Sequence, residues 1–223
     1  MSNTILTLDS SIDSCSFAIY KNHDIQVIQE YCKKKHTTKM LPMLQKILLQ
    51  TNTKLHDLNY IAFAKGPGNF TSIRFAASIA QSLSLSLNIP IMSVSTLSIM
   101  AQQAWRKYQK KEIIILLNTQ KKNVYWGQYI RNTESIWTGS KTETVIEKTK
   151  IQNKIQSLKK IWTVVSNPSK ICCYARIPQI KNIKYFFPNA QDIIPFVLLK
   201  IQKKEHNFSI NSNINYLDKK FNI

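Results

Sequence analysis

The chain has 223 residues, a formal net charge of +19 and 43% hydrophobic residues. This length suffices for one large domain or two small ones, each with a buried core. No apolar run reaches the ~18 residues of a membrane-spanning helix, and the first residues lack the basic and apolar regions of a secretory signal. The four cysteines form no C-x-x-C pair, so we expect reduced thiols in a cytoplasmic protein.

The positive charge would ordinarily favour a nucleic-acid partner. However, the 31 basic residues are scattered in short clusters, and they are mostly lysines accompanied by abundant Ile and Asn. An AT-rich genome imposes that composition on most proteins that it encodes. We therefore interpret most lysines as solvated surface residues, and we expect only weak, salt-dependent RNA affinity through phosphate contacts.

The first elements expected are strands at 4–8 and 14–20, separated by the polar turn Asp9-Ser10-Ser11, and a short strand at 25–28. An acidic residue after the first strand is how nucleotide-binding folds of the actin and sugar-kinase type begin, although Asp and Ser also favour ordinary turns. A helix should open at His36, with Thr37 or Thr38 as its cap. His36 itself is expected to be a capping or surface group, because no second metal ligand follows it at helical spacing.

Residues 60–96 form the most informative stretch. An apolar run at 60–64 is short enough for a buried strand, and the tight loop Gly66-Pro67-Gly68-Asn69-Phe70 follows it. Thr71 is the expected N-cap of a helix that Asn88 and Pro90 end, and residues 91–94 then form another strand. The predicted unit is therefore strand, glycine loop, helix, strand.

The predicted helix of this unit carries an apolar stripe of mostly small residues at spacings of three and four. The stripe consists of Ile73, Ala76, Ala77, Ala80, Leu83 and Leu87. Small side chains let another backbone approach closely. The pattern alone favours packing on the helix's own sheet, with a docking face for another protein as the alternative.

The polar segment 106–111, which follows a helical pattern from 97 to 105, is the best candidate for a domain junction. We therefore expect two domains, 1–108 and 109–223. Strands are predicted in the second domain at 113–117, 124–130 and 161–165, and helices near 150–158 and 190–202. The polar, Asn-rich tail from Lys203 predicts partial disorder.

Searches for catalytic motifs find no match. The chain has no G-x-x-x-x-G-K-[ST] phosphate loop, no G-x-G-x-x-G, no G-x-S-x-G and no H-E-x-x-H. Its 4 histidines and 12 carboxylates show no spacing that indicates an acid–base pair or a metal site. The sequence therefore predicts no catalytic residue and no metal ligand.

Several segments within about the first 140 residues resemble the TsaB (YeaZ) family. They are HTTKMLP at 36–42, GPGNFTSIR at 66–74 and IMSVSTL at 91–97, followed by weaker matches at 100–107 and 124–126. Members of this family are accessory subunits in the biosynthesis of threonylcarbamoyladenosine on bacterial tRNA. The resemblance implies an actin-like, Hsp70-like α/β fold with two subdomains, each a mixed sheet flanked by helices.

The resemblance also implies a function. The chain would bind and activate the paralogous catalytic subunit TsaD, which modifies the adenosine 3′ of the anticodon in tRNAs that read codons beginning with A. The small ATPase TsaE would complete the set, and tRNA would be contacted indirectly or weakly. The chain alone would bind no cofactor, although ATP or ADP could bind in the complex. TsaD's two metal-binding histidines align with Thr96 and Met100, neither of which can replace an imidazole, so a non-catalytic role is expected.

In this family the helices that begin near Thr37 and Thr71 pair with the catalytic subunit, which favours the docking alternative. The expected partner-binding residues are Met40, Leu44, Ile47, Ile73, Ala76, Ala77, Ala80 and Leu83. A homodimer through the same helices is a further expectation. The expected structural loop comprises Gly66, Pro67, Gly68, Phe70, Thr71 and Arg74.

Other classes of protein stay open as alternatives. A stand-alone sugar-kinase-like enzyme would need Asp9 as a metal or phosphate partner and a second acidic phosphate loop, which is not found. A peptidase would need a nucleophile–base pair. An RNA-binding module would need aromatic residues interleaved with basic ones, and no such platform is recognisable.

Overall fold

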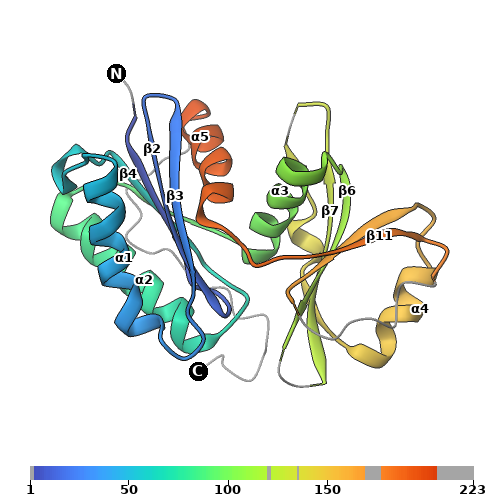
Figure 1. Ribbon diagram of the computed structural model, residues 1–223. Helices are drawn as coiled ribbons and strands as arrows, with labels where there is room; N and C mark the ends of the chain where they lie inside the picture. Colours follow the sequence, from blue (N-terminus) through green and yellow to red (C-terminus); the bar gives the residue numbers. More distant parts are fainter. Residues whose placement is uncertain (1–2, 120–121, 135, 169–176, 205–223) are drawn as a thin grey trace. The chain divides into compact units, whose positions relative to one another are not determined.

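The computed structural model describes residues 3–119, 122–134, 136–168 and 177–204. These residues form two compact units, each with its own sheet (Figure 1). Unit 1 holds the residues up to Ile99 and the described residues from Pro188 onward, and unit 2 holds Met100–Phe187. The division expected from the sequence lies instead at 108/109 and keeps the last helix in the second domain. Cys172, Cys173 and most of the polar tail lie outside the described residues.

The sheet of unit 1 has five strands in the order β3-β2-β1-β4-β5. β1 (Ile5–Asp9), β2 (Ser14–Lys21) and β3 (Asp24–Tyr31) form an antiparallel meander. β4 (Tyr60–Ala64) and β5 (Ile91–Val94) extend it in parallel from β1. All five predicted strands of this region are present, and the third is longer than expected.

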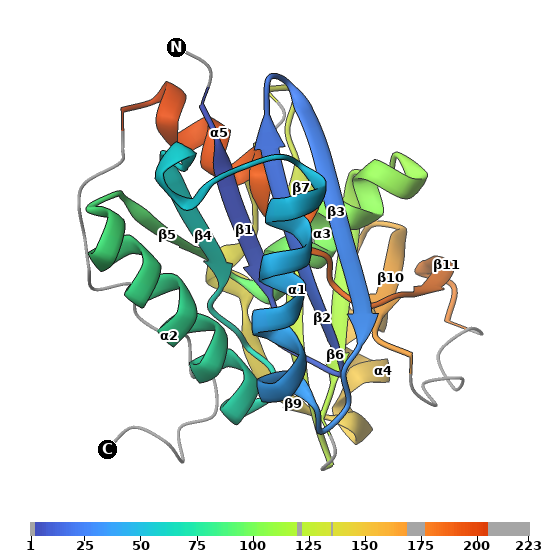
Figure 2. The ribbon, with the colours of Figure 1, turned by 60° about the vertical axis from the view of Figure 1, so that its left-hand side comes forward.

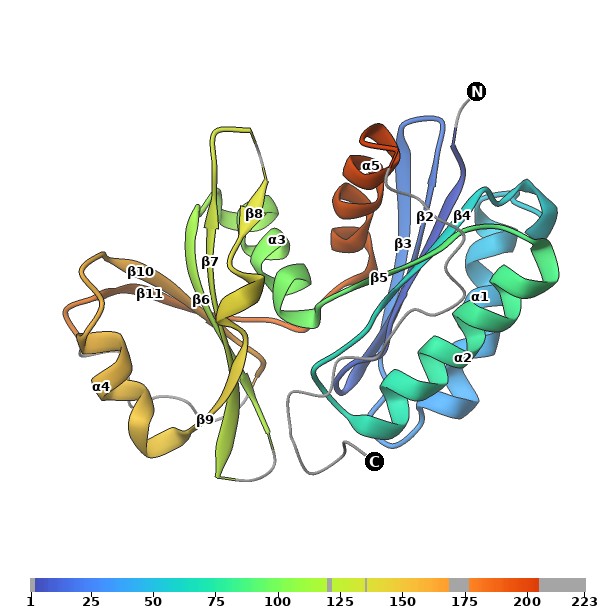
Figure 3. The same cartoon turned by 180° about the vertical axis from the view of Figure 1, so that it is seen from behind.

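Helices cover both faces of this sheet, as Figure 2 and Figure 3 show. α1 (His36–Gln50) and α2 (Phe70–Leu87) lie on one face, and α5 (Ile194–Gln202) follows a short 3-10 turn, η5 (Ala190–Ile193), on the other. Side chains alternate between the two cores, as strand geometry requires. Ile61 and Phe63 of β4 pack with α1 and α2, whereas Ala62 packs in the other core with η5 and α5.

Unit 2 is built on a sheet in the order β11-β10-β6-β7-β8, with β9 paired to β7. Its strands are β6 (Glu112–Asn118), β7 (Asn123–Arg131), β8 (Trp137–Thr138), β9 (Thr144–Glu147), β10 (Trp162–Ser166) and β11 (Ile180–Tyr185). The helix α4 (Ile151–Gln156) packs on it through Ile151 and Ile155, and α3 (Thr96–Tyr108) leads into it from β5. The three predicted strands are confirmed. The short or half-exposed strands β8, β9 and β11 were not predicted, because they lack a continuous apolar pattern.

The helix ends correct several sequence expectations. α2 begins after Asn69 rather than Thr71, and α1 begins after Lys35, in both cases without a side-chain cap bond. Asn88 ends α2 in the left-handed conformation, as predicted. His36 is neither a cap nor a surface residue, because it is buried and its Nε2 lies 2.7 Å from the carbonyl oxygen of Ile12. Over the described ranges, no helix has the length and apolar character needed to cross a membrane.

Candidate functional site

The glycine loop between β4 and α2 is fastened to the turn between β1 and β2. The N–H of Asn69 donates to the carbonyl of Ser11 at 2.6 Å, and the hydroxyl of Ser10 donates to the carbonyl of Ser72 at 2.7 Å. A Cβ atom on Gly68 would lie 2.0 Å from the Ser11 carbonyl oxygen. Only glycine therefore lets the loop approach this turn so closely.

The rest of the expected structural loop lies around this contact. Gly66 has a φ of 94° and accepts a hydrogen bond from the Thr96 N–H at 2.8 Å, while Pro67 beside it is buried. At the start of α2, the Arg74 guanidinium lies 3.9 Å from the centre of the Phe70 ring. Thr71 is exposed in the first turn. The loop thus sets where α2 begins and how it lies on the sheet.

Asp9 ends β1 beside the same turn. Its Oδ1 accepts the Ser11 N–H at 3.1 Å, and its Oδ2 is buried without a hydrogen-bond partner among the described residues. Burial raises the pKa of Asp9 to about 6, although hydrogen bonds from Ser11 act in the opposite direction. The described part of the chain contains no cluster of three or more His, Cys, Asp or Glu residues suited to a metal ion. Asp9 therefore brings one carboxylate to this turn without the further ligands that a metal site uses.

The residues expected to dock a partner face the sheet of unit 1. Seven of them are at most 7% exposed: Met40, Leu44, Ile47, Ile73, Ala76, Ala77 and Ala80. The eighth, Leu83, is half-buried against the same core. This corrects their placement on an outer surface, because a helix on a sheet buries its most apolar stripe first. The alanines let α2 approach the sheet closely. The alternative that the sequence left open, packing on the helix's own sheet, is the arrangement observed.

The outward sides of α1 and α2 carry other apolar residues. Leu41 and Leu49 of α1 are 54% and 74% exposed, and Leu85 of α2 is 69% exposed. The exposed serines Ser78 and Ser82 precede Leu85 on the same side of α2, at helical spacings. The two helices lie side by side on one face of the sheet (Figure 2). This outward face, which we call the α1–α2 face, was missed because its apolar residues are fewer than those of the buried stripe.

Two α/β units with mixed sheets, the first with a strand, glycine loop, helix and strand, define a protein of the actin-like, Hsp70-like class. Solved structures show the same fold. YeaZ from Pseudomonas aeruginosa superposes with a TM-score of 0.82 at 23% identity, over 96% of this chain and all of that one. The predicted fold class is therefore confirmed.

Comparison of sequences assigns the family. The family model described as TsaD, tRNA N6-adenosine threonylcarbamoyltransferase, matches residues 21–187. The tRNA threonylcarbamoyladenosine biosynthesis protein TsaB of Buchnera aphidicola subsp. Acyrthosiphon pisum (strain APS) is 58% identical, over 99% of this chain and 100% of its own. The Escherichia coli K12 protein of the same name is 37% identical, over 72% of this chain and 70% of its own. The chain belongs to the TsaB family, and the likeness extends well beyond the segments that first indicated it.

Proposed function

We propose that this chain is the non-catalytic subunit that binds and activates TsaD in the threonylcarbamoylation of tRNA. The proposed target is the adenosine 3′ of the anticodon in tRNAs that read codons beginning with A. The observation that carries the proposal is the 58% identity, along almost the full length of both chains, to a relative named for threonylcarbamoyladenosine biosynthesis. The match of residues 21–187 to the TsaD family model supports a paralogous relationship with the proposed partner.

The positions of the TsaD histidines support a non-catalytic role. Thr96 and Met100, the residues aligned with those metal ligands, are both completely buried in α3. A threonine hydroxyl and a thioether do not replace imidazoles at a catalytic metal. We propose that TsaE joins the complex, and that any ATP or ADP binds in the complex rather than to this chain alone. The complex is proposed to work in the cytoplasm.

We place the contact with TsaD on the α1–α2 face. Exposed leucines on adjacent helices supply the apolar centre that a specific protein interface needs, and Leu41, Leu49 and Leu85 are the candidates. Ser78 and Ser82 have small side chains on the outer side of α2, so that the backbone of a partner helix can approach closely. A homodimer of the free chain would use the same face and would compete with TsaD.

Reconstitution tests the function. The full chain is combined with TsaD, TsaE, ATP, the threonylcarbamoyl donor system and unmodified tRNA, and digested tRNA is assayed by mass spectrometry for threonylcarbamoyladenosine. We expect product only when the chain is present, and none when TsaD is omitted. Equal product without the chain would refute the proposed role.

A pair of substitutions tests the docking face. Leu49→Asp combined with Leu85→Asp places two carboxylates where we expect an apolar interface, so TsaD binding should weaken at least ~100-fold while the fold persists. Leu55→Asp is the matched control, since Leu55 is also an exposed leucine of unit 1 but lies outside α1 and α2. Calorimetric titration with TsaD measures both. Unchanged affinity of the folded double variant would place the interface elsewhere.

A further inference from the structure

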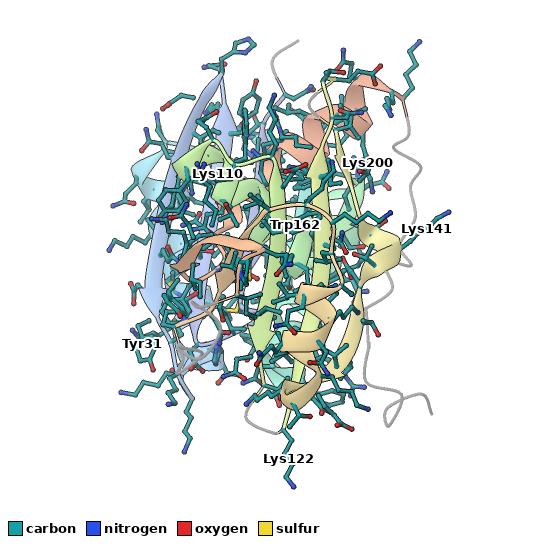
Figure 4. All side chains as sticks on the ribbon, turned by 90° about the vertical axis from the view of Figure 1, so that its right-hand side faces the viewer. Tyr31, Lys110, Lys122, Lys141, Trp162 and Lys200 are labelled. Atoms are coloured by element: carbon teal, nitrogen blue, oxygen red, sulfur yellow. The ribbon has the colours of Figure 1, made fainter. Side chains whose placement is uncertain are left out.

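One edge of the unit 2 sheet, where several strands begin or end, carries a solvent-open cavity of about 420 Å³. β6, β10 and β11 run parallel and begin at this edge, and β7 runs antiparallel to β6 and ends there. The residues that matter for its chemistry are Lys110, Lys111, Glu112, Arg131 and Lys181. Figure 4 shows Lys110 and Trp162 near this edge of the sheet. Lys122, which directly precedes β7, lies at the opposite edge of the same sheet.

The cavity carries an unbalanced positive charge. Four cations line it, from three different segments of unit 2, against the single carboxylate of Glu112. That carboxylate is already paired, because Lys160 Nζ lies 2.9 Å from Glu112 Oε1. None of the ion pairs found among the described residues involves Lys110, Lys111, Arg131 or Lys181. An anion entering the cavity would therefore meet cations that no carboxylate neutralises in the described part of the chain.

Arg131 is held in place at this cavity. Its guanidinium carbon lies 4.2 Å from the centre of the Trp105 ring, and its backbone N–H donates to the Lys111 carbonyl at 2.9 Å. Its Nε is buried without a hydrogen-bond partner among the described residues. Burial also lowers the pKa of Arg131, since part of its solvation is lost. A guanidinium that is fixed by stacking and has no counter-ion among the described residues is suited to receive an anion at its outer N–H groups.

Trp162 begins β10 at this end of the sheet but adds no donor to the site. Its side chain is 2% exposed and packs with Ile151 and Ile155 of α4. Ile130 of β7 packs in the same core, so the next residue, Arg131, points to the opposite face of the sheet, where it stacks on Trp105. The cations, rather than the buried N–H groups, are therefore what the cavity presents to a ligand.

We propose that this cavity binds a phosphate group of an RNA backbone, with Arg131 as the anchor. The exposed Lys111 and Lys181 extend the positive charge beyond the anchor, as a contact with consecutive phosphates requires. Trp105, which also lies 5.9 Å from Lys111 Nζ, holds these cations together. The inference rests on the proposed function only in naming tRNA as the RNA.

Binding of unmodified tRNA to the full chain, without TsaD, tests the proposal. Fluorescence anisotropy is measured at several salt concentrations for Lys111→Glu/Lys181→Glu and for the control Lys122→Glu/Lys141→Glu. Both pairs change the charge equally, and all four lysines are exposed. We expect the first pair to weaken binding at least tenfold and to reduce the salt slope by about one to two, and the control pair to change affinity less than threefold. Equal losses would overturn the proposal, because diffuse charge would then explain them.

Inorganic phosphate tests the chemistry of the cavity. Titrated into the ¹⁵N-labelled chain, it should shift the backbone amide signals of Lys111, Arg131 and Lys181, and Arg131→Gln should abolish the shifts at the two lysines. Absence of these shifts in the wild-type chain would overturn the proposal. Phosphate shifts together with wild-type tRNA affinity in the Lys111→Glu/Lys181→Glu variant would also overturn it, because the site would then serve a small anion.

Titration with TsaD separates this inference from the proposed function. The Lys111→Glu/Lys181→Glu variant should bind TsaD as the wild type does, because its substitutions lie in unit 2, whereas the α1–α2 face belongs to unit 1. Failure of the wild-type chain to bind TsaD would refute the docking proposal and leave the tRNA result standing. Loss of TsaD binding in the variant would contradict a phosphate-specific cavity.

Discussion

The two sides of α2 differ in what their small residues do. The inward side carries Ala76, Ala77 and Ala80, which are at most 2% exposed and let the helix lie close to its own sheet. The outward side carries Ser78 and Ser82, which are exposed and lead to the exposed Leu85. A stripe of small residues therefore shows that something packs closely against a helix, while burial decides whether that is the helix's own sheet.

Ala80→Asp should have the largest effect, because it places a carboxylate in a completely buried position of the unit 1 core. We expect a loss of about 4–5 kcal/mol in the free energy of unfolding, enough to unfold a marginal domain. Ser82→Asp is the matched control on the outward side and should change it by less than about 0.5 kcal/mol. Urea unfolding measures both. Similar losses from the two variants would mean that α2 is buried on both sides.

Gly68→Ala comes next, because its Cβ would lie 2.0 Å from the Ser11 carbonyl oxygen. Since that atom belongs to the backbone, either the loop or the β1–β2 turn must move, and we expect a loss of about 3 kcal/mol or more. Asn69→Ala is the control, because Asn69 is exposed and its bond to Ser11 uses the backbone N–H. It should cost less than about 0.5 kcal/mol. A stable Gly68→Ala variant would show that the loop is not held against the turn.

The strand, loop, helix and strand of unit 1 could be predicted because local signals agree with the fold there. A short apolar run gave β4, glycines gave the turn, and Asn88 in the left-handed conformation ends α2. The N-caps could not be predicted, because the start of α2 is set by a bond from Asn69 to Ser11, far away in the sequence. Likewise His36 looked like a surface group only because Ile12, its contact, belongs to another segment.

The candidate sites show the same limit more strongly. Periodicity located α2 but could not tell the side that packs on the sheet from the side that is left outside. The cavity of unit 2 has no sequence signature, because Lys111, Arg131 and Lys181 come to one cavity only when β6, β7 and β11 align at one sheet edge. The scattered lysines were reasonably interpreted as solvated, since only the fold shows which of them share a cavity.

Asp9→Asn tests the buried end of β1, to which the glycine loop is attached. The folded-state pKa of Asp9 is about 6, against 3.8 for an ordinary aspartate, so the fold favours the protonated carboxyl. Its contribution to stability is therefore present below pH 3.8 and is lost as the pH rises through about 6. The shift corresponds to about 3 kcal/mol. Asn can still accept the Ser11 N–H, so at pH 8 the variant should be more stable than the wild type by up to about 3 kcal/mol.

The measurement for Asp9→Asn is urea unfolding between pH 4 and pH 8. The variant should lack the decline in stability that the wild type shows between these values. Parallel pH profiles for the two chains would mean that Asp9 is ionised and solvated in the folded state, and that the turn under the glycine loop is open to water.

Ser84→Ala has the smallest expected effect and extends the comparison to the last turn of α2. Ser84 is buried, and its hydroxyl donates to the Ile89 carbonyl at 2.6 Å, across the left-handed Asn88. Losing this bond leaves a carbonyl unpaired and should cost about 1 kcal/mol. Ser86→Ala, at an exposed position two residues on, should be neutral or slightly stabilising, because alanine is the better helix former. Thermal unfolding measures the Tm of both variants. The same Tm for both would mean that buried Ser84 stabilises the fold no more than exposed Ser86, and that the two sides of α2 do not differ in its last turn.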